Sequence, residues 1–287
     1  MSYASVVLAD TPVGYWKLDE ASGTTCTDYS GNGRNIGYQG TPHFQIAGPV
    51  ASDSPSYGIG FDAVNYENAW VSTPSWAALS NVTIELWYRT TATVSGYTRI
   101  FGYGVNTAVS TSTYLLYMVS GGLLRASFYM NGTTVTLSYA TAINDGIWRH
   151  LAFGVSAKSD PYGYTLHVNG AQEAGTVYSS GTIGTGLSPS GAFRIGAADT
   201  TNTIAAEYAH AALYSSRLSA AKIAAHYAAA SAGVISPSEG RLFHTGYAPS
   251  IAQPRWILPS NGVLVVSGNT PSLLAAVTRQ PSTAKLS

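Results

Sequence analysis

The sequence predicts an all-β protein, an antiparallel two-sheet sandwich or jelly roll with one short helix near its end and an extended arm after it. The 287 residues include 20 Tyr and 30 Gly. Aromatic residues favour pleated strands, and glycines favour the tight turns between strands. Short apolar runs alternate along the chain with Gly, Asn, Asp, Ser and Pro, a spacing that is typical of sandwiches and jelly rolls.

The predicted strands are short, numerous and bounded by turn residues. They cover residues 14–18, 56–61, 82–89, 97–103, 114–119, 123–130, 133–139, 148–155, 164–168, 193–196 and 207–214.

The sequence of residues 123–139 predicts a β-hairpin. Thr133, Val135, Leu137 and Tyr139 alternate with Ser and Thr residues, which predicts one buried face and one solvated face. Asn131-Gly132 precedes this run and follows another strand. Both central residues of a type I′ turn need positive φ, so this dipeptide predicts an antiparallel pairing of residues 123–130 with 133–139.

A helix is predicted over residues 220–230. Ser219 is placed to cap it, Ile223 and Tyr227 lie four residues apart on one face, and Gly233 follows as a stop. We therefore expect residues 1–234 to form a single jelly-roll domain.

Residues 235–287 have a different character and predict an extended arm. They hold six of the chain's 13 prolines, which no regular helix or sheet can run through unbroken. Apolar islands between the prolines need a surface to lie on, and a hairpin about Asn261-Gly262 is one arrangement open to them. The predicted anchoring residues are Trp256, Ile257, Leu258, Val263, Val265, Leu273 and Leu274.

Charge and cysteine content exclude several classes of protein. The net charge is zero, so the clustered Lys and Arg that bind nucleic acid or an anionic membrane are not expected. Only 10% of residues are charged, which predicts a surface partly covered by neighbouring subunits. Cys26 is alone, so an internal disulfide is impossible. The sequence also predicts no secretory signal and no membrane-spanning helix.

Eight short motifs, in order, resemble the laminin G-like jelly rolls of the concanavalin A-like lectin/glucanase superfamily. The resemblance covers roughly residues 3 to 233 and implies two antiparallel sheets of six or seven strands, with Trp16, Trp87 and Trp148 in the core. The motifs are VLADTPVGYWKLDE (7–20), DYSGNG (28–33), GIGFD (58–62), VTIELW (82–87), WRHLA (148–152), LHVNG (166–170), RIG (194–196) and ALYSSRLS (212–219).

The opening and closing motifs further resemble copies of this domain in virion proteins of tailed bacteriophages. That resemblance implies assembly in the host cytoplasm, localisation in the virion, capsid or tail partners, and a trimer by analogy with other projecting phage proteins. A chain without a signal sequence or a disulfide agrees with it.

Hydrolytic chemistry finds no support among the residues. A glycosidase of this superfamily would show paired carboxylates alternating on one strand, but residues 83–87 offer Glu85 alone, interpreted as a strand-end polar residue. The six histidines lack zinc-protease spacing, and His150 and His210 are expected to satisfy hydrogen bonds near the sheets. We expect no enzymatic activity.

Calcium is the one cofactor that the sequence leaves open. Asp28, Ser30 and Asn32 alternate along a glycine-rich turn whose oxygens suit a hard cation. The resemblance adds that related domains often hold calcium near this loop, although the acidic residues expected before the final strand are here Ala209 and His210. A structural Asx turn explains the same pattern equally well.

Sugar binding by stacking needs an exposed aromatic platform with polar groups beside it. Trp70 and Trp76 are the candidates, supported by Tyr66 and Asn68. The alternative is that these tryptophans belong to the core.

The leading prediction is therefore a non-enzymatic virion protein that displays a jelly roll and is anchored by residues 235–287. The alternative is a carbohydrate-binding module that recognises host-surface glycan, and the third reading, a glycan hydrolase, rests on superfamily analogy alone.

Overall fold

The fold is known from a computed structural model, in which the chain forms two compact units, Met1–Ala232 and Gly233–Ser287. The structure describes residues 2–53, 55–63, 67–104, 112–130, 133–156, 163–174, 176–177, 191–196, 203–231, 265–266 and 273–274.

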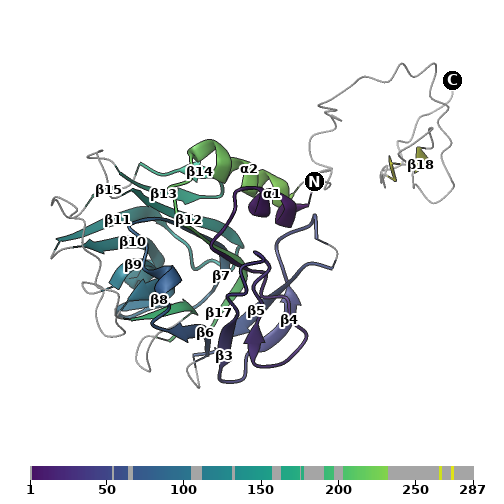
Figure 1. The fold of residues 1–287 in the computed structure, drawn as a ribbon, viewed down its shortest axis with the longest axis horizontal. Coiled ribbons are helices and arrows are strands. Elements are labelled where there is room, and N and C mark those ends of the chain that lie inside the picture. The colour runs from purple at the N-terminus through teal and green to yellow at the C-terminus, as the bar shows by residue number, and fades with distance from the viewer. Residues whose placement is uncertain are drawn as a thin grey trace, which may run out of the picture. The chain divides into compact units, whose positions relative to one another are not determined.

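The first unit contains an eight-stranded antiparallel sheet, which we call the first sheet (Figure 1). The long strands β7 (Asn81–Arg89) and β17 (Ala206–Tyr214) pair with each other at its centre. The short strand β1 (Gly14–Trp16) pairs with the edge of β17 that faces away from β7. In spatial order the strands are β14 (Ala171–Gln172), β13 (Tyr164–Val168), β12 (Arg149–Ser156), β7 (Asn81–Arg89), β17 (Ala206–Tyr214), β5 (Tyr57–Phe61) and β4 (His43–Ala47), with β1 (Gly14–Trp16) on β17.

A nine-stranded antiparallel sheet, the second sheet, packs against the first. Its spatial order is β15 (Thr176–Val177), β11 (Thr133–Ala142), β10 (Leu123–Met130), β9 (Ser112–Val119), β8 (Tyr97–Gly104), β16 (Ala192–Gly196), β6 (Asn68–Ser72), β3 (Ile36–Gln39) and β2 (Thr25–Cys26). Two 3-10 turns, η1 (Ser75–Ala77) and η3 (Ser120–Gly122), flank it. The predicted all-β sandwich is confirmed, with more strands in each sheet than the resemblance implies.

The main core fills the space between the sheets. On β7, Ile84, Leu86 and Tyr88 point into it, because alternate residues of a strand share a face. Trp16 and Phe193 meet there with ring centroids 5.0 Å apart. Trp16 is thus a core residue, as the resemblance implies.

The hairpin predicted from Asn131-Gly132 is confirmed by its strands. β10 and β11 pair antiparallel, and Met130 lies opposite Thr133, so the loop between them has the two residues of the dipeptide. Val135 and Leu137 are buried as expected, whereas Ser138, expected on a solvated face, is buried as well. The turn residues themselves lie outside the described part of the chain.

Two helices lie side by side over the outer face of the first sheet (Figure 1). α2 (Ala220–Ala230) is the predicted helix, and Ser219 caps it by accepting a hydrogen bond from the backbone N–H of Lys222. α1 (Tyr3–Ala9) was not predicted; Ser2 caps it in the same way, and it buries Tyr3. No helix of the described residues is long and apolar enough to cross a membrane.

In the second unit the structure describes two short strands, β18 (Val265–Val266) and β19 (Leu273–Leu274), which pair antiparallel. The other anchoring residues, Trp256, Ile257, Leu258 and Val263, lie outside the described residues, as does Asn261-Gly262. The anchoring role of Val265, Leu273 and Leu274 stays a prediction.

Candidate functional site

The helices α1 and α2 cover one end of the outer face of the first sheet, and the other end is open to solvent. Glu85, Trp87 and Arg89 are alternate residues of β7 and share this face. Glu85 is buried beneath α2, whereas about a third of the Arg89 side chain is exposed. One strand therefore carries both a buried polar network and an open pocket.

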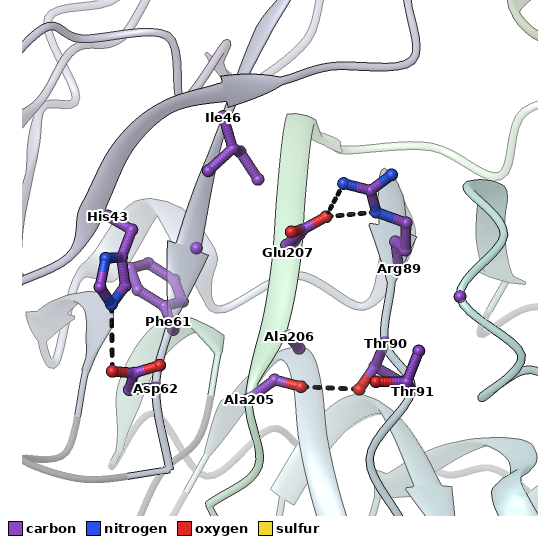
Figure 2. Close-up of a pocket in the computed structure, with 12 residues that line it drawn as sticks. His43, Ile46, Phe61, Asp62, Arg89, Thr90, Thr91, Ala205, Ala206 and Glu207 are labelled. Atoms are coloured by element: carbon purple, nitrogen blue, oxygen red, sulfur yellow. Dashed lines mark hydrogen bonds and ion pairs between the residues drawn. The ribbon is translucent and has the colours of Figure 1, made fainter.

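The open part holds a pocket of about 490 Å³, the Arg89 pocket (Figure 2). Arg89 forms an ion pair with Glu207, its cross-strand neighbour on β17. Thr90 Oγ1 donates a hydrogen bond to the carbonyl oxygen of Ala205, at 2.6 Å. The polar side chains that line the pocket are His43, Asp62, Arg89, Thr90, Thr91 and Glu207.

At the other wall of the pocket, His43 and Asp62 meet where β4 begins and β5 ends (Figure 2). His43 Nε2 lies 3.0 Å from Asp62 Oδ2, and both side chains are about half exposed or more. The hydrogen bond and the negative charge of Asp62 raise the pKa of His43. The pocket thus offers several groups that donate or accept hydrogen bonds, which is what sugar hydroxyls require.

An aromatic surface lies directly beside this pocket. The guanidinium carbon of Arg89 lies 4.8 Å from the ring centroid of Trp148, a cation–π contact. Trp148 also lines a second hollow, of about 330 Å³, with Trp87 and Tyr227. The rings of Trp87 and Tyr227 stack with centroids 5.7 Å apart. We call Trp87, Trp148 and Tyr227 the aromatic strip.

The sequence interpretation of Trp148 as a core residue holds only in part, because this side chain packs against the buried cluster under the helices but is itself partly exposed and lines a hollow. Trp87 is buried as expected, but in the small cluster under the helices and not between the sheets. Trp148 lies one residue before β12, at the end of the sheet, where the sandwich no longer encloses it.

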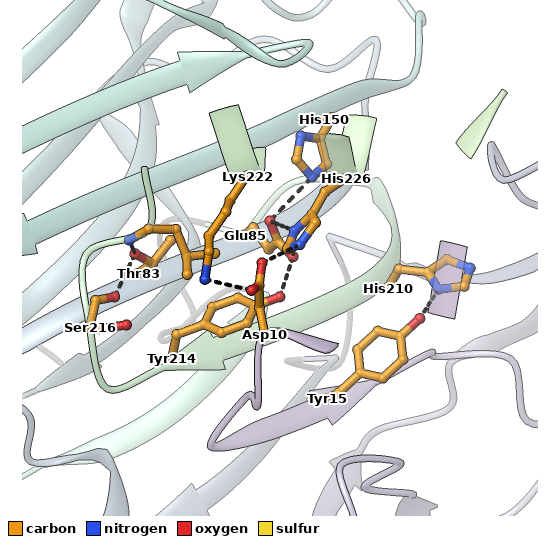
Figure 3. Close-up of polar contacts among 11 residues, drawn as sticks. Asp10, Tyr15, Thr83, Glu85, His150, His210, Tyr214, Ser216, Lys222 and His226 are labelled. Carbon is orange, nitrogen blue, oxygen red and sulfur yellow. Dashed lines mark hydrogen bonds and ion pairs between the residues drawn. The ribbon is translucent and has the colours of Figure 1, made fainter. Parts of the chain in front are cut away.

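The covered part of the face holds a buried polar network centred on Glu85 (Figure 3). Tyr214 donates a hydrogen bond of 2.6 Å to Glu85 Oε1. His226 Nδ1 lies 2.9 Å from the same oxygen, and His150 Nε2 lies 3.5 Å from Oε2. The interpretation of Glu85 as a strand-end polar residue is therefore wrong, because its carboxylate is fully enclosed near the middle of β7.

The opposite charges of Glu85 and His226 stabilise each other. Burial alone would raise the pKa of Glu85, but the neighbouring His226 and His150 hold it well below its usual range. Burial would lower the pKa of His226, but Glu85 and Asp10 raise it. Asp10 Oδ2 lies 3.1 Å from His226 Nε2, and Lys222 Nζ lies 2.6 Å from Asp10 Oδ1. Since helices, strand and side chains enclose these groups, we assign them a structural role.

His210 lies deeper on the same face, beside Tyr15 (Figure 3). Tyr15 Oη and His210 Nδ1 are 2.7 Å apart, and burial lowers the pKa of His210 to about 3. The expectation that these histidines satisfy hydrogen bonds near the sheets therefore holds for His210, whereas the ring nitrogens of His150 make no hydrogen bond among the described residues and only Nε2 lies near Glu85.

The residues predicted to bind glycan do not form one exposed platform. Trp76 packs against Trp16 and Phe193, with ring centroids 5.9 and 5.1 Å away. Trp70 lies on the second sheet, with the guanidinium carbon of Arg194 5.0 Å from its ring centroid. Asn68 is buried. Tyr66 lies outside the described residues.

The loop predicted to hold calcium is built on the Asp28 carboxylate. Asp28 Oδ1 accepts hydrogen bonds from the backbone N–H groups of Tyr15 and Ser30. Oδ2 accepts from the Ser30 hydroxyl and the N–H of Arg34. Asn32 Nδ2 donates to the carbonyl oxygens of Pro12 and Val13. The bond from Ser30 N–H to the Asp28 side chain, two residues earlier, is an Asx turn, so the geometry fits the structural alternative.

Comparison with protein families gives a match between residues 64–224 and the model of the concanavalin A-like lectin/glucanases superfamily, Laminin_G_3. This chain belongs to that superfamily. The match includes Arg89, Trp148 and Glu207, whereas His43 and Asp62 precede it. Comparison with curated proteins gave no match.

Solved structures with a similar fold include a sialidase and the binding domains of a neurotoxin and of a mosquitocidal protein. Trypanosoma rangeli sialidase in complex with sialic acid has a TM-score of 0.55 at 14% identity, over 75% of this chain and 32% of that one. The binding domain of botulinum neurotoxin DC in complex with SialylT has a TM-score of 0.57 at 12% identity, over 78% and 52%. The binding domain of Paraclostridial Mosquitocidal Protein 1 has 0.55 at 15% identity, over 77% and 52%.

This superfamily member therefore spans about a third of the sialidase chain and about half of the two binding domains. At these identities the likeness shows the fold alone, because one fold carries many functions. Function has to be argued from the residues of the site.

Proposed function

We propose that the chain is a carbohydrate-binding module without enzymatic activity, and that the Arg89 pocket together with the aromatic strip is its glycan site. One observation carries this proposal: Arg89 belongs to both surfaces, pairing with Glu207 in the pocket and lying over the ring of Trp148. Sugar sites combine an aromatic face, on which the sugar ring stacks, with a few polar groups that fix its hydroxyls.

The charges of the pocket favour a neutral glycan. Asp62 and Glu207 supply two carboxylates, and the guanidinium of Arg89 is already paired with one of them. A sugar carboxylate entering here would meet like charges, which costs binding free energy. Although the similar structures include complexes with sialic acid and SialylT, we therefore propose a hydroxyl-rich neutral sugar as ligand of this chain.

The same pairs argue against hydrolysis. A retaining glycosidase needs one carboxylic acid that donates a proton and one free carboxylate. In the pocket, Glu207 is engaged by Arg89 and Asp62 by His43. Both carboxylates thus already have a side-chain partner, Arg89 for Glu207 and His43 for Asp62, an arrangement suited to accepting hydrogen bonds from hydroxyl groups.

The test is a glycan array with the full chain and two matched tryptophan variants. Trp148 and Trp70 each lie under an arginine, at 4.8 and 5.0 Å, but on opposite sheets. We expect Trp148→Ala to weaken binding about tenfold or more, because a stacking aromatic contributes on the order of 1.5 kcal/mol. We expect Trp70→Ala to leave binding within about threefold of the unaltered chain.

The other outcomes of the array would change the proposal. If Trp70→Ala weakened binding and Trp148→Ala did not, the glycan site would lie on the platform predicted from the sequence, around Trp70. Absence of binding to neutral and acidic glycans alike would overturn the proposal. Release of reducing sugar from a bound glycan would overturn the non-enzymatic part.

The virion role rests on the sequence resemblance alone. We propose, as a separate prediction, that residues 235–287 anchor the chain to capsid or tail proteins, in a trimer. If it is right, deletion of these residues leaves a folded domain that no longer joins particles. Incorporation of the truncated chain would contradict it.

A further inference from the structure

Three residues with metal-binding side chains converge at the edge of the Arg89 pocket. His43 begins β4, Asp62 directly follows β5, and Glu67 directly precedes β6. Their ligand atoms all lie within 4.8 Å of one another. The pairing of β4 with β5 brings His43 close to the end of β5, where Asp62 lies.

The buried member of the group is Glu67, whose hydrogen-bond donors are neutral and beside which His43 can carry a positive charge. Its side chain is 1% exposed. Oε1 accepts hydrogen bonds from the N–H and the hydroxyl of Thr41, and Oε2 accepts one from the N–H of Asp62. Among the described residues, no Lys or Arg forms an ion pair with it. A buried carboxylate held by neutral donors beside a second carboxylate is electrostatically costly unless a cation compensates.

The geometry of the other two residues suits a shared ion. His43 Nε2 and Asp62 Oδ2 are 3.0 Å apart, close to the roughly 3.3 Å that separates two ligands of a tetrahedral zinc at about 2.0 Å each. The His43 and Asp62 side chains are 60% and 48% exposed, so solvent and not packed side chains surrounds a large part of each. The Glu67 side chain is fixed by Thr41 and would serve as the anchor point.

We propose that His43 Nε2, an oxygen of Asp62 and Oε2 of Glu67 bind one divalent transition-metal ion, with zinc preferred. One imidazole and two carboxylates suit zinc, whereas calcium and magnesium prefer oxygen ligands alone. Three protein ligands leave a fourth position of a tetrahedral ion for water or another ligand.

The ion would also belong to the wall of the pocket, because His43 and Asp62 line it. A sugar hydroxyl is the natural occupant of the fourth position, and this part of the inference rests on the proposed glycan function. The metal site itself does not depend on it, and it is separate from the Asp28 loop considered for calcium.

Metal binding is tested on the full chain after dialysis against a chelator. Calorimetric titration with zinc chloride is expected to give one ion per chain, and cobalt(II) is expected to give the visible absorption of a four- or five-coordinate site. His43→Ala and Asp62→Asn should each weaken zinc binding about tenfold or more, since each removes one ligand. Both side chains are exposed, so both variants should keep the fold, which urea unfolding checks.

Asp145→Asn is the matched control, because Asp145 is an exposed carboxylate paired with Arg149 away from this group. It should leave zinc binding unchanged, and excess calcium or magnesium should not displace the zinc. No zinc binding, or zinc binding that neither His43→Ala nor Asp62→Asn alters, would overturn the site. Titrating glycan with and without zinc separates the two proposals, since zinc binding without glycan binding sinks only the glycan function.

Discussion

His226 of α2 and Glu85 of β7 are both buried, with Nδ1 and Oε1 2.9 Å apart. This contact joins the C-terminal helix of the sandwich to the middle of its central strand. The same imidazole reaches Asp10 through Nε2, at 3.1 Å, so one side chain connects the sheet, α2 and the end of α1.

Replacing Glu85 by glutamine should strongly destabilise the sandwich. Glu85→Gln removes the fully buried carboxylate that faces His226 and leaves this imidazole with Asp10 as its one acidic partner among the groups described above, which costs about 3 kcal/mol of unfolding free energy. Urea unfolding followed by tryptophan fluorescence measures the loss. Asp145→Asn, at an ion pair whose carboxylate is nearly half exposed, should cost less, about 1 kcal/mol. Equal effects of the two substitutions would show that the network is not structural.

Stability should fall as the pH drops below neutrality, because two histidines are buried in the neutral form. Burial lowers the pKa of His167 to about 4 and that of His210 to about 3, from an ordinary 6.5. Between these values the unfolded chain binds more protons than the folded one. Each group then removes about 1.4 kcal/mol of unfolding free energy per pH unit.

The Glu85 network adds two further pH dependences to the unfolding free energy. Because the pKa of His226 is raised on folding, the stability that His226 contributes is complete below pH 6.5 and is lost as the pH rises further. Because the pKa of Glu85 is lowered on folding, the stability that Glu85 contributes is complete above pH 4.5 and is lost in stronger acid. Unfolding free energy measured across the pH range should therefore be greatest near pH 6.5 to 7. His167→Leu should flatten the acid side, and an unchanged slope would refute the assignment to His167.

The Asp28 loop should depend on its carboxylate and not on calcium. Partial burial would raise the pKa of Asp28, but the hydrogen bonds from Tyr15, Ser30 and Arg34 lower it, so the ionised form is the one the loop uses. Asp28→Ala should cost about 2 to 3 kcal/mol of unfolding free energy. Thermal unfolding should not respond to EGTA or to added calcium. A clear rise of the unfolding temperature with calcium would favour the metal alternative.

Trp76 should matter for stability and not for glycan binding. Its ring packs against Trp16 and Phe193, so Trp76→Ala leaves a gap at the edge of the core and should cost about 2 kcal/mol. Urea unfolding and the glycan array, used together, separate the two roles. A variant that is fully stable but no longer binds glycan would restore Trp76 to the binding site.

Most of the longer strands were predictable from the sequence because they alternate or end at turn residues, whereas β3, β4 and β6 were not predicted. The hairpin of β10 and β11 follows from Asn131-Gly132 placed between two β-type runs, the second of which alternates. α1 was missed because its short run, Tyr3 to Ala9, contains β-branched Val6 and Val7, which favour strands. Ser2 was the available signal, as an N-cap residue.

The candidate site could not be predicted, for a topological reason. Arg89, Trp148 and Glu207 come from three segments far apart in the sequence, and only the pairing of β7 with β17 and β12 sets them side by side. No local pattern encodes that register. The burial of Glu85 could not be predicted, because the residues before and after it on β7 are apolar. A strand with apolar residues on both faces does not show which cover lies over its outer face, here the two helices.

The contact of Asp10 with Lys222 and His226 also joins the segment that enters the sandwich to the segment that leaves it. β1 and the end of β17 are neighbours, so the polypeptide enters and leaves the sandwich at adjacent points. α1 and α2 close this place twice, through the ionic contacts of Asp10 and through a buried apolar cluster that includes Tyr3, Val7 and Ile223. Any change that separates the two helices therefore also opens the point where the first and last strands of the sandwich meet.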